Sequence, residues 1–394
     1  MAKDNEEFDF NNWDNLPVIC TASSNINKAE AVQYNLEWTI TTCDQLWTVL
    51  RCIQRRYKDA ELDYPQTFWF RGHGKEEYVL LPSLIRTYFS KNLQCSLPQY
   101  QKMLLENFMA RSKGTPELIP NNQAKRNNEQ IEYLADMQHY GVSTNLLDWS
   151  EDVSTALFFA TEKKSLCHSV LYVLHPYFYN FVRSAIISMY QLYELVGGDK
   201  YNHESARVSV GGLIPNFSAH FNVMFKQFEN YVVGPETFFS LRDESKWRSI
   251  DPMDTLEFQN THAPLLPLAV QIPRSNPRIR SQTGTFLAFN LCEFPLADRL
   301  RKAERYLGFS HIELEFVQRF YMENEYLAKT IERKPGSSYR AMRNKLPFLH
   351  KILIDKNAAS GIRDLVEMLG KRTSTVYPEL FRIGEQIVEE TKDI

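Results

Sequence analysis

The sequence lacks the short motifs that identify the commonest nucleotide-binding and hydrolytic enzymes. It contains no Gly-x-x-x-x-Gly-Lys-Ser/Thr loop and no Gly-x-Gly-x-x-Gly, so neither a P-loop nor a Rossmann nucleotide site is indicated. The zinc-protease motif His-Glu-x-x-His and the hydrolase motif Gly-x-Ser-x-Gly are absent as well. These absences remove several large enzyme classes from consideration.

The sequence also lacks an excess of positive charge. The 394 residues carry a formal net charge of −3, and the sequence pI is about 6.3. A protein that neutralises many phosphates usually has a basic excess, so the charge balance does not indicate nucleic acid as a partner. A local basic face at Arg274, Arg278 and Arg280 stays open as an alternative, although a solvated loop explains the same short run of charge.

Cysteine motifs and long apolar runs are missing too. Six cysteines are scattered without a Cys-x-x-Cys pair and nine histidines are dispersed, so neither a disulfide framework nor a metal site is predicted. No window approaches 18 uncharged apolar residues, which predicts no membrane-spanning helix. The first residues, Met-Ala-Lys-Asp-Asn-Glu-Glu, have no apolar stretch behind them. We therefore expect no signal peptide and a cytoplasmic protein.

What the sequence does contain is enough apolar material for a large core, since 43% of its residues are hydrophobic. Short β-prone runs and longer helical patterns follow one another without strict alternation, which predicts an α+β fold with a mixed or antiparallel sheet. The main strands are expected at 67–71, 169–174, 284–289 and 349–354. The main helices are expected at 42–56, 98–109, 131–140, 153–160 and 181–195, and from residue 360 onward.

The first segment with unusual chemistry is Trp69-Phe70-Arg71-Gly72. An arginine at the end of an aromatic strand needs a partner for its guanidinium, because an unpaired buried charge is costly. The planar fork suits a phosphate or a carboxylate of a ligand, and a pairing with a structural residue such as Asp148 explains it equally well. The glycine beside it would allow a ligand or another backbone segment to approach closely.

Two further segments are rich in polar side chains. Residues 138–150 gather hydroxyls, amides, a carboxylate and two aromatic rings before a buried helix, and polar loops this dense often form sites. Helix capping explains Asp148 and Ser150 without any ligand. In residues 277–286, Gln282 and Gly284 open a strand, for which an ordinary strand entry with a bulge is the simpler interpretation.

These segments, in this order, resemble the FRG-domain family, which is named for its Phe-Arg-Gly motif. The motif stands here at residues 70–72, followed by Leu-Pro-Ser-Leu at 81–84, Gln-His-Tyr-Gly at 138–141 and Leu-Leu-Asp-Trp-Ser at 146–150. The resemblance implies one FRG domain over 36–394 after a polar arm at 1–35. Its core segments would lie at about 40–175 and 265–390, with a largely helical insertion at about 177–262.

A more distant resemblance connects the chain to mono-ADP-ribosyltransferases of the Arg-Ser-Glu type. Arg71 is similar to the arginine on that family's first core strand, which holds the phosphates and ribose of NAD. Ser143 and Thr144, with the helix that follows, look like its Ser/Thr-rich second element. Where that family has a catalytic glutamate, this sequence has Gln282. The resemblance implies a split-sheet, ADP-ribosyltransferase-like core.

The same resemblance implies an enzyme that uses NAD as its substrate. It assigns catalytic roles to Arg71, Gln282 and Tyr140, and cofactor-binding roles to Arg71, Gly72, His139, Ser143, Thr144 and Asp148. Either Glu313 or Glu315 could supply the charge that Gln282 lacks. A macromolecule is a possible acceptor, and the expected context is an intracellular effector in bacterial or phage conflict.

Two other classes of function stay open at this stage. The first is a non-catalytic sensor module that binds a nucleotide or a peptide in the same pocket. The second is a nuclease, which would need clustered carboxylates and a metal ion. Asp148, Glu151 and Asp152 form the best such cluster, and they are better explained as a helix cap with a negative first turn.

Overall fold

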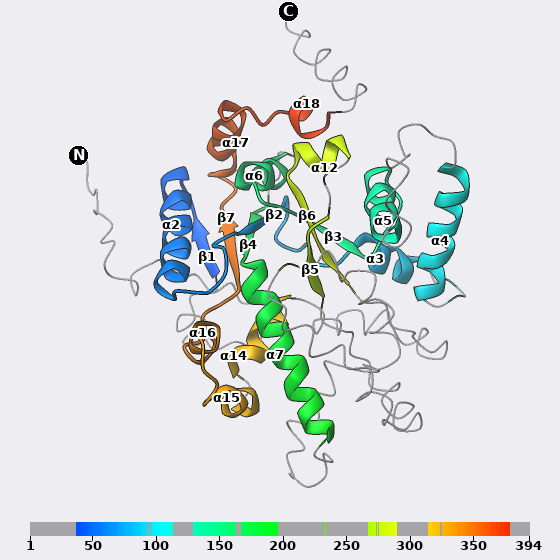
Figure 1. The fold of residues 1–394 in the computed structure, drawn as a ribbon. Coiled ribbons are helices and arrows are strands. Elements are labelled where there is room, and N and C mark those ends of the chain that lie inside the picture. The colour runs from blue at the N-terminus through cyan, green and yellow to red at the C-terminus, as the bar shows by residue number, and fades with distance from the viewer. Residues whose placement is uncertain are drawn as a thin grey trace, which may run out of the picture.

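The computed structural model describes residues 37–112, 129–162, 167–195, 233, 267–289 and 314–378, apart from residues 92, 94, 96, 273, 275 and 324. Within these residues the strands form one open sheet of seven strands in the order β1-β7-β4-β2-β3-β6-β5 (Figure 1). Their bounds are Glu37–Ile40 (β1), Trp69–His73 (β2), Leu146–Ser150 (β3), Ser169–Leu174 (β4), Leu268–Val270 (β5), Gly284–Ala288 (β6) and Leu349–Ile354 (β7). Only the β1–β7 pair is parallel, so the predicted mixed, mainly antiparallel sheet is confirmed.

Twelve helices surround this sheet within the described ranges. They are α2 (Cys43–Asp59), α3 (Ser83–Ser90), α4 (Leu97–Ser112), α5 (Glu129–His139), α6 (Val153–Thr161), α7 (Pro176–Leu195), α12 (Pro277–Ser281), α14 (Leu314–Glu323), α15 (Glu325–Ile331), α16 (Ser337–Arg343), α17 (Ala359–Met368) and α18 (Thr373–Val376). In Figure 1, α6, α12, α17 and α18 gather at one end of the sheet, and α14, α15 and α16 lie at the other. No helix among these residues is both long and apolar enough to cross a membrane.

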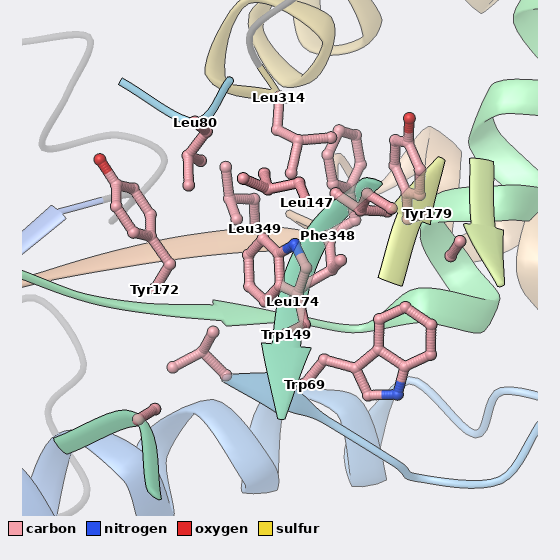
Figure 2. Close-up of a cluster of buried hydrophobic side chains, with 14 of the residues drawn as sticks. Trp69, Leu80, Leu147, Trp149, Tyr172, Leu174, Tyr179, Leu314, Phe348 and Leu349 are labelled. Atoms are coloured by element: carbon pink, nitrogen blue, oxygen red, sulfur yellow. The ribbon is translucent and has the colours of Figure 1, made fainter. Parts of the chain in front are cut away.

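The core forms around the central strands. All six residues of β4 are buried, because neighbours pair with it on both edges and helices cover it. Figure 2 shows part of this core, where Trp69, Trp149 and Leu174 of three central strands lie near Phe348 and Leu314. The strands expected at 169–174 and 349–354 have the predicted bounds, and all of their residues except Lys351 are buried, as expected for central strands covered on both faces.

The β2–β3 pair has the fewest paired residues in the sheet. Five residues of β2 pair with β4, whereas β2 meets β3 only at the pair of Phe70 and Ser150. The expectation of a split sheet is therefore corrected to one continuous sheet, because this pair joins its two halves. Beyond the pair the two strands are no longer joined by a ladder. An ADP-ribosyltransferase-like core stays a prediction.

The prediction that Asp148 caps the helix after residue 150 is wrong. Asp148 lies inside β3, opposite Phe286 of β6, and does not cap the following helix. That helix, α6, is capped by Asp152, whose carboxylate accepts hydrogen bonds from the Ser154 amide and from the hydroxyls of Ser154 and Thr155. Pairing with β6 is a non-local contact, so the local sequence could not decide which aspartate caps the helix.

Other expectations differ in their bounds or lie outside the described residues. The helix expected from Ser360 begins one residue earlier, at Ala359, without a side-chain cap. The helix expected at 181–195 begins at Pro176 and forms α7. The polar arm at 1–35 lies outside the described residues, as does almost all of the expected insertion beyond α7.

Candidate functional site

A cavity of about 590 Å³ lies where β2 and β3 separate, and α6 and α12 contribute to its walls. Its lining residues are Phe70, Arg71, Gly72, His73, Gly74, Lys75, Tyr78, Arg86, Ala135, Gln138, His139, Asp148, Trp149, Ser150, Thr155, Ala156, Phe159, Glu162, Arg278, Ile279, Gln282 and Phe286. A volume in this range suits a small molecule or a cofactor. All three segments singled out in the sequence reach this cavity.

Arg71 is fixed in this cavity by two hydrogen bonds. Its Nε donates to Nε2 of His73 at 2.9 Å, and its Nη1 donates to the backbone carbonyl of Asp148 across the gap between the strands. The alternative that Arg71 pairs with Asp148 is thus realised in part, through the backbone of that residue. Both bonds hold the guanidinium in one plane, and its remaining donors are not used by these two partners.

The imidazole of His73 is neutral when it accepts the hydrogen bond from Arg71. Burial, together with the positive charge of Arg71, lowers the pKa of His73 to about 3. Its Nδ1 lies 3.1 Å from the carbonyl of Tyr78, which can only accept, so Nδ1 carries the proton and Nε2 accepts from Arg71. Burial also lowers the pKa of Arg71 to about 10, and the charge of Asp148 opposes this shift. The guanidinium therefore stays charged at neutral pH.

The cavity carries more positive than negative side chains, although the whole chain is slightly acidic. Its cations are Arg71, Lys75, Arg86 and Arg278, and its carboxylates are Asp148 and Glu162. Lys75 also pairs with Glu77 outside the lining. An anionic group such as a phosphate is therefore favoured at this site, because arginine forks match its oxygens.

The sequence left open whether a ligand or a backbone segment comes close to Gly72, and the structure shows a backbone segment there. A Cβ atom built on it would lie 1.8 Å from the carbonyl oxygen of Ala156 and 2.7 Å from the amide nitrogen of Ala160. The backbone segment that comes close to this glycine is thus helix α6. Gly72 lines the cavity, but close packing of α6 on β2 already requires a glycine at this position.

Gln282 lies at the cavity and also contacts the C-terminal part of the described chain. It is the C-cap of α12, and its amide Nε2 donates to the carbonyl of Val376 at 3.1 Å. Its backbone carbonyl accepts from the hydroxyl of Ser150 at 2.6 Å. Tyr377, which follows Val376 in the chain, donates its hydroxyl to Glu162 at 3.2 Å. The donor side of the Gln282 amide is therefore engaged within the protein.

Three residues expected at the site do not line the cavity. Tyr140 is exposed, and its ring packs 4.6 Å from that of His139, which does line the cavity. The hydroxyl of Ser143 lies 3.2 Å from that of Thr87. Thr144 is fully buried and donates to Gln138 at 2.5 Å. These hydroxyls fix the loop before β3, which explains their presence without a ligand.

The carboxylates considered for a nuclease or for charge compensation have other positions. Glu151 binds Arg274 and Gln271, and Asp152 caps α6 and pairs with Lys371 at 2.6 Å. Among the described residues no group of three or more His, Cys, Asp or Glu side chains could hold a metal ion. Glu315 lies in α14 and does not line the cavity, and Glu313 lies outside the described residues.

Six charged or aromatic residues at the cavity lie outside the three segments that the sequence analysis singled out. They are His73, Lys75, Tyr78, Arg86, Phe159 and Glu162. Lys75 and Tyr78 follow the Phe-Arg-Gly motif closely, and Arg86 follows the Leu-Pro-Ser-Leu segment, so proximity to a motif was the available signal. Glu162 is the first residue after the buried helix α6, and no local pattern pointed to it.

The neutral state of His73 predicts a pH dependence of stability. An unfolded histidine takes up a proton below pH about 6.5, whereas His73 in the folded protein does not until pH about 3, so stability falls as the pH drops through this window. Between pH 7 and pH 5, urea denaturation should show a loss about 2 kcal/mol larger for the parent than for His73→Gln. The glutamine can still accept from Arg71. Equal pH dependence in both proteins would show that His73 is protonated in the folded state.

Comparison with known families finds a match that covers part of this site. Residues 66–168 match the sequence model of the FRG domain. This range contains β2, β3 and α6, which form much of the cavity wall. No curated protein and no solved structure matches the chain. The FRG resemblance of the remaining segments stays a prediction, while an FRG domain is present at residues 66–168.

Proposed function

We propose that the cavity binds NAD and that the protein cleaves the bond between nicotinamide and ribose, as an ADP-ribosyltransferase or an NAD glycohydrolase does. The observation that carries this proposal is the fixed guanidinium of Arg71, held by neutral His73 and the Asp148 carbonyl in a cavity with excess positive charge. A diphosphate is the part of NAD that this arrangement suits, because the arginine is positioned before the ligand arrives.

The remaining walls fit the other parts of such a ligand. Phe70, Phe159 and Phe286 supply aromatic surface for flat rings, and Tyr78 is exposed at the same cavity. The oxygen of the Gln282 amide could accept from a ribose hydroxyl, since the nitrogen of that amide already donates to Val376. Gly72 and His139 line the cavity and would contact the cofactor. Positive charge that develops on the ribose needs a carboxylate, which Gln282 cannot provide.

Three expected site residues take indirect roles in this proposal. Tyr140 supports His139, and Ser143 and Thr144 hold the loop that leads into β3. We propose an intracellular effector with a macromolecular acceptor, in bacterial or phage conflict, as the setting of this activity.

A sensor module that binds the nucleotide without cleaving it is the second candidate. The observation that favours it is the uncharged Gln282 at the position of the expected glutamate, with its amide bound to the chain's own Val376 carbonyl. Such a protein would use the same cavity and the same arginine. Its output would be a change in the contacts of the segment around Val376.

Incubation of the protein with NAD separates these functions. Free nicotinamide is measured by chromatography over time, and NAD binding is measured in parallel by calorimetry. Release of nicotinamide above a heat-inactivated control supports the enzyme. Binding without release supports the sensor. Neither binding nor release would show that NAD is not the ligand of this cavity.

A further inference from the structure

We infer that Asp148 is the catalytic carboxylate of this cavity, and that it accepts the proton of the nucleophile that replaces nicotinamide. The inference rests on the proposed cleavage of NAD and names the group that supplies the charge missing from Gln282. It gives Asp148 a role at the reacting atoms in place of the helix cap that the sequence suggested.

The position of Asp148 in β3 leaves its carboxylate accessible to a ligand in the cavity. In β3 it is the one exposed residue among five, with Leu147 and Trp149 buried on either side of it. It lines the cavity beside the point where β2 and β3 separate. Because the side chain of Asp148 is exposed, its carboxylate stays solvated in this otherwise buried strand and can face a ligand in the cavity.

The other nearby carboxylates are occupied, and that of Asp148 is not. Glu151 pairs with Arg274, Asp152 caps α6, and Glu162 accepts from Tyr377. Within the part of the chain that the structure describes, Asp148 makes its hydrogen bond to Arg71 through its backbone carbonyl, and no donor binds its carboxylate. Its oxygens are therefore free to accept a proton or to face a cation.

Arg71 sets the place of this carboxylate relative to a bound ligand. The same residue that binds the guanidinium through its backbone carbonyl also carries the carboxylate, so the two groups lie within one residue of each other. Both side chains line the same cavity, so their opposite charges face the same space. The diphosphate and the ribose are neighbours in a dinucleotide. A ligand that binds Arg71 through its diphosphate would thus present the adjoining ribose near Asp148.

The chemistry balances with water as the nucleophile. The bond between C1′ of the ribose and the pyridinium nitrogen breaks, and its electron pair stays on that nitrogen, which becomes neutral nicotinamide. An oxygen of water forms the new bond to C1′, and its proton passes to Asp148 and then to solvent. The products are nicotinamide, ADP-ribose and one proton. The carboxylate also faces the positive charge that develops on the ribose in the transition state.

Substitution of Asp148 by asparagine tests this role. Asp148→Asn keeps the shape of the side chain and the backbone carbonyl that binds Arg71. We expect kcat for nicotinamide release to fall by at least about 10²-fold, with KM for NAD within about threefold of the parent. Asp148→Glu should recover at least about a tenth of the parental kcat.

Asp152→Ala is the matched control, since this neighbouring aspartate has a purely structural role. Removal of the cap should lower the melting temperature, because a cap contributes about 0.5–2 kcal/mol, while kcat per folded molecule stays near the parental value. Asp148→Asn should change the melting temperature by less than about 2 °C. The two aspartates should therefore give opposite signatures.

The outcomes separate this inference from the function on which it rests. A parent that releases no nicotinamide overturns the proposed cleavage, and the role of Asp148 with it. A parent that releases nicotinamide, with an Asp148→Asn variant of similar kcat, overturns the role of Asp148 alone. Loss of the thermal transition in Asp148→Asn would show that the residue is structural and would overturn the inference equally.

Discussion

Gly72→Ala should destabilise the folded protein by about 3 kcal/mol or more, or prevent it from folding. The new methyl group would lie 1.8 Å from the carbonyl oxygen of Ala156. The atoms of α6 that it would meet are all backbone atoms. No side chain can rotate away, so β2 and α6 would have to separate. Urea denaturation or the melting temperature measures this loss.

Gly74→Ala is the control for this substitution. It lies two residues further along the same segment, and a Cβ atom there would find its nearest neighbour, the carbonyl oxygen of Ala160, at 3.9 Å. That is an ordinary van der Waals distance, so the control should keep stability within about 1 kcal/mol of the parent. Equal stability of Gly72→Ala and the parent would show that α6 does not pack on β2 as closely as the structure has it.

The strands that could be predicted from the sequence are those with a strong local signal. The runs at 169–174 and 349–354 are short and rich in Val, Leu and Ile, and both became strands with the expected bounds. The strand expected at 67–71 is displaced by two residues, to Trp69–His73, because pairing with β4 continues through Gly72 to His73. Strand pairing, and not local preference, decides such a boundary.

The site divides in the same way between local and non-local signals. Arg71 and Gln282 were found because family motifs mark them, and both line the cavity. The position of Asp148 was missed because three residues in a row of five, Asp148, Ser150 and Asp152, can all cap a helix. Pairing of Asp148 with Phe286, far away in sequence, resolves this ambiguity. Glu162 has no motif of its own, so only the fold brings it to the cavity.

The second large effect is expected for Arg71→Lys, in which the affinity for NAD and kcat/KM should both fall by about 10²–10³-fold. Arginine uses Nε to reach His73 and Nη1 to reach the Asp148 carbonyl, and it still has donors for a phosphate. The single ammonium of lysine cannot serve both partners and the ligand. Loss of two charge-assisted hydrogen bonds in a bound complex corresponds to about 3–4 kcal/mol, which is the stated range.

Stability should respond to Arg71→Lys less than binding does. Nε2 of His73 loses its donor, which costs about 1–3 kcal/mol if no water replaces it, but the thermal transition should remain cooperative. Arg340→Lys is the matched control, because Arg340 lies on α16 away from the cavity and pairs with the exposed Glu61. That exposed pair contributes little, so its substitution should leave stability and NAD binding near the parental values.

Calorimetric titration of the folded variants with NAD, with circular dichroism to monitor folding, decides between the two roles of Arg71. Weak binding by a folded Arg71→Lys protein identifies the guanidinium as the phosphate-binding group. Binding as tight as that of the parent would assign the phosphates to Arg86, Lys75 or Arg278 instead. Loss of the thermal transition would show that the bonds from Arg71 to His73 and Asp148 serve to close the gap between β2 and β3, where a single residue pair joins the two halves of the sheet.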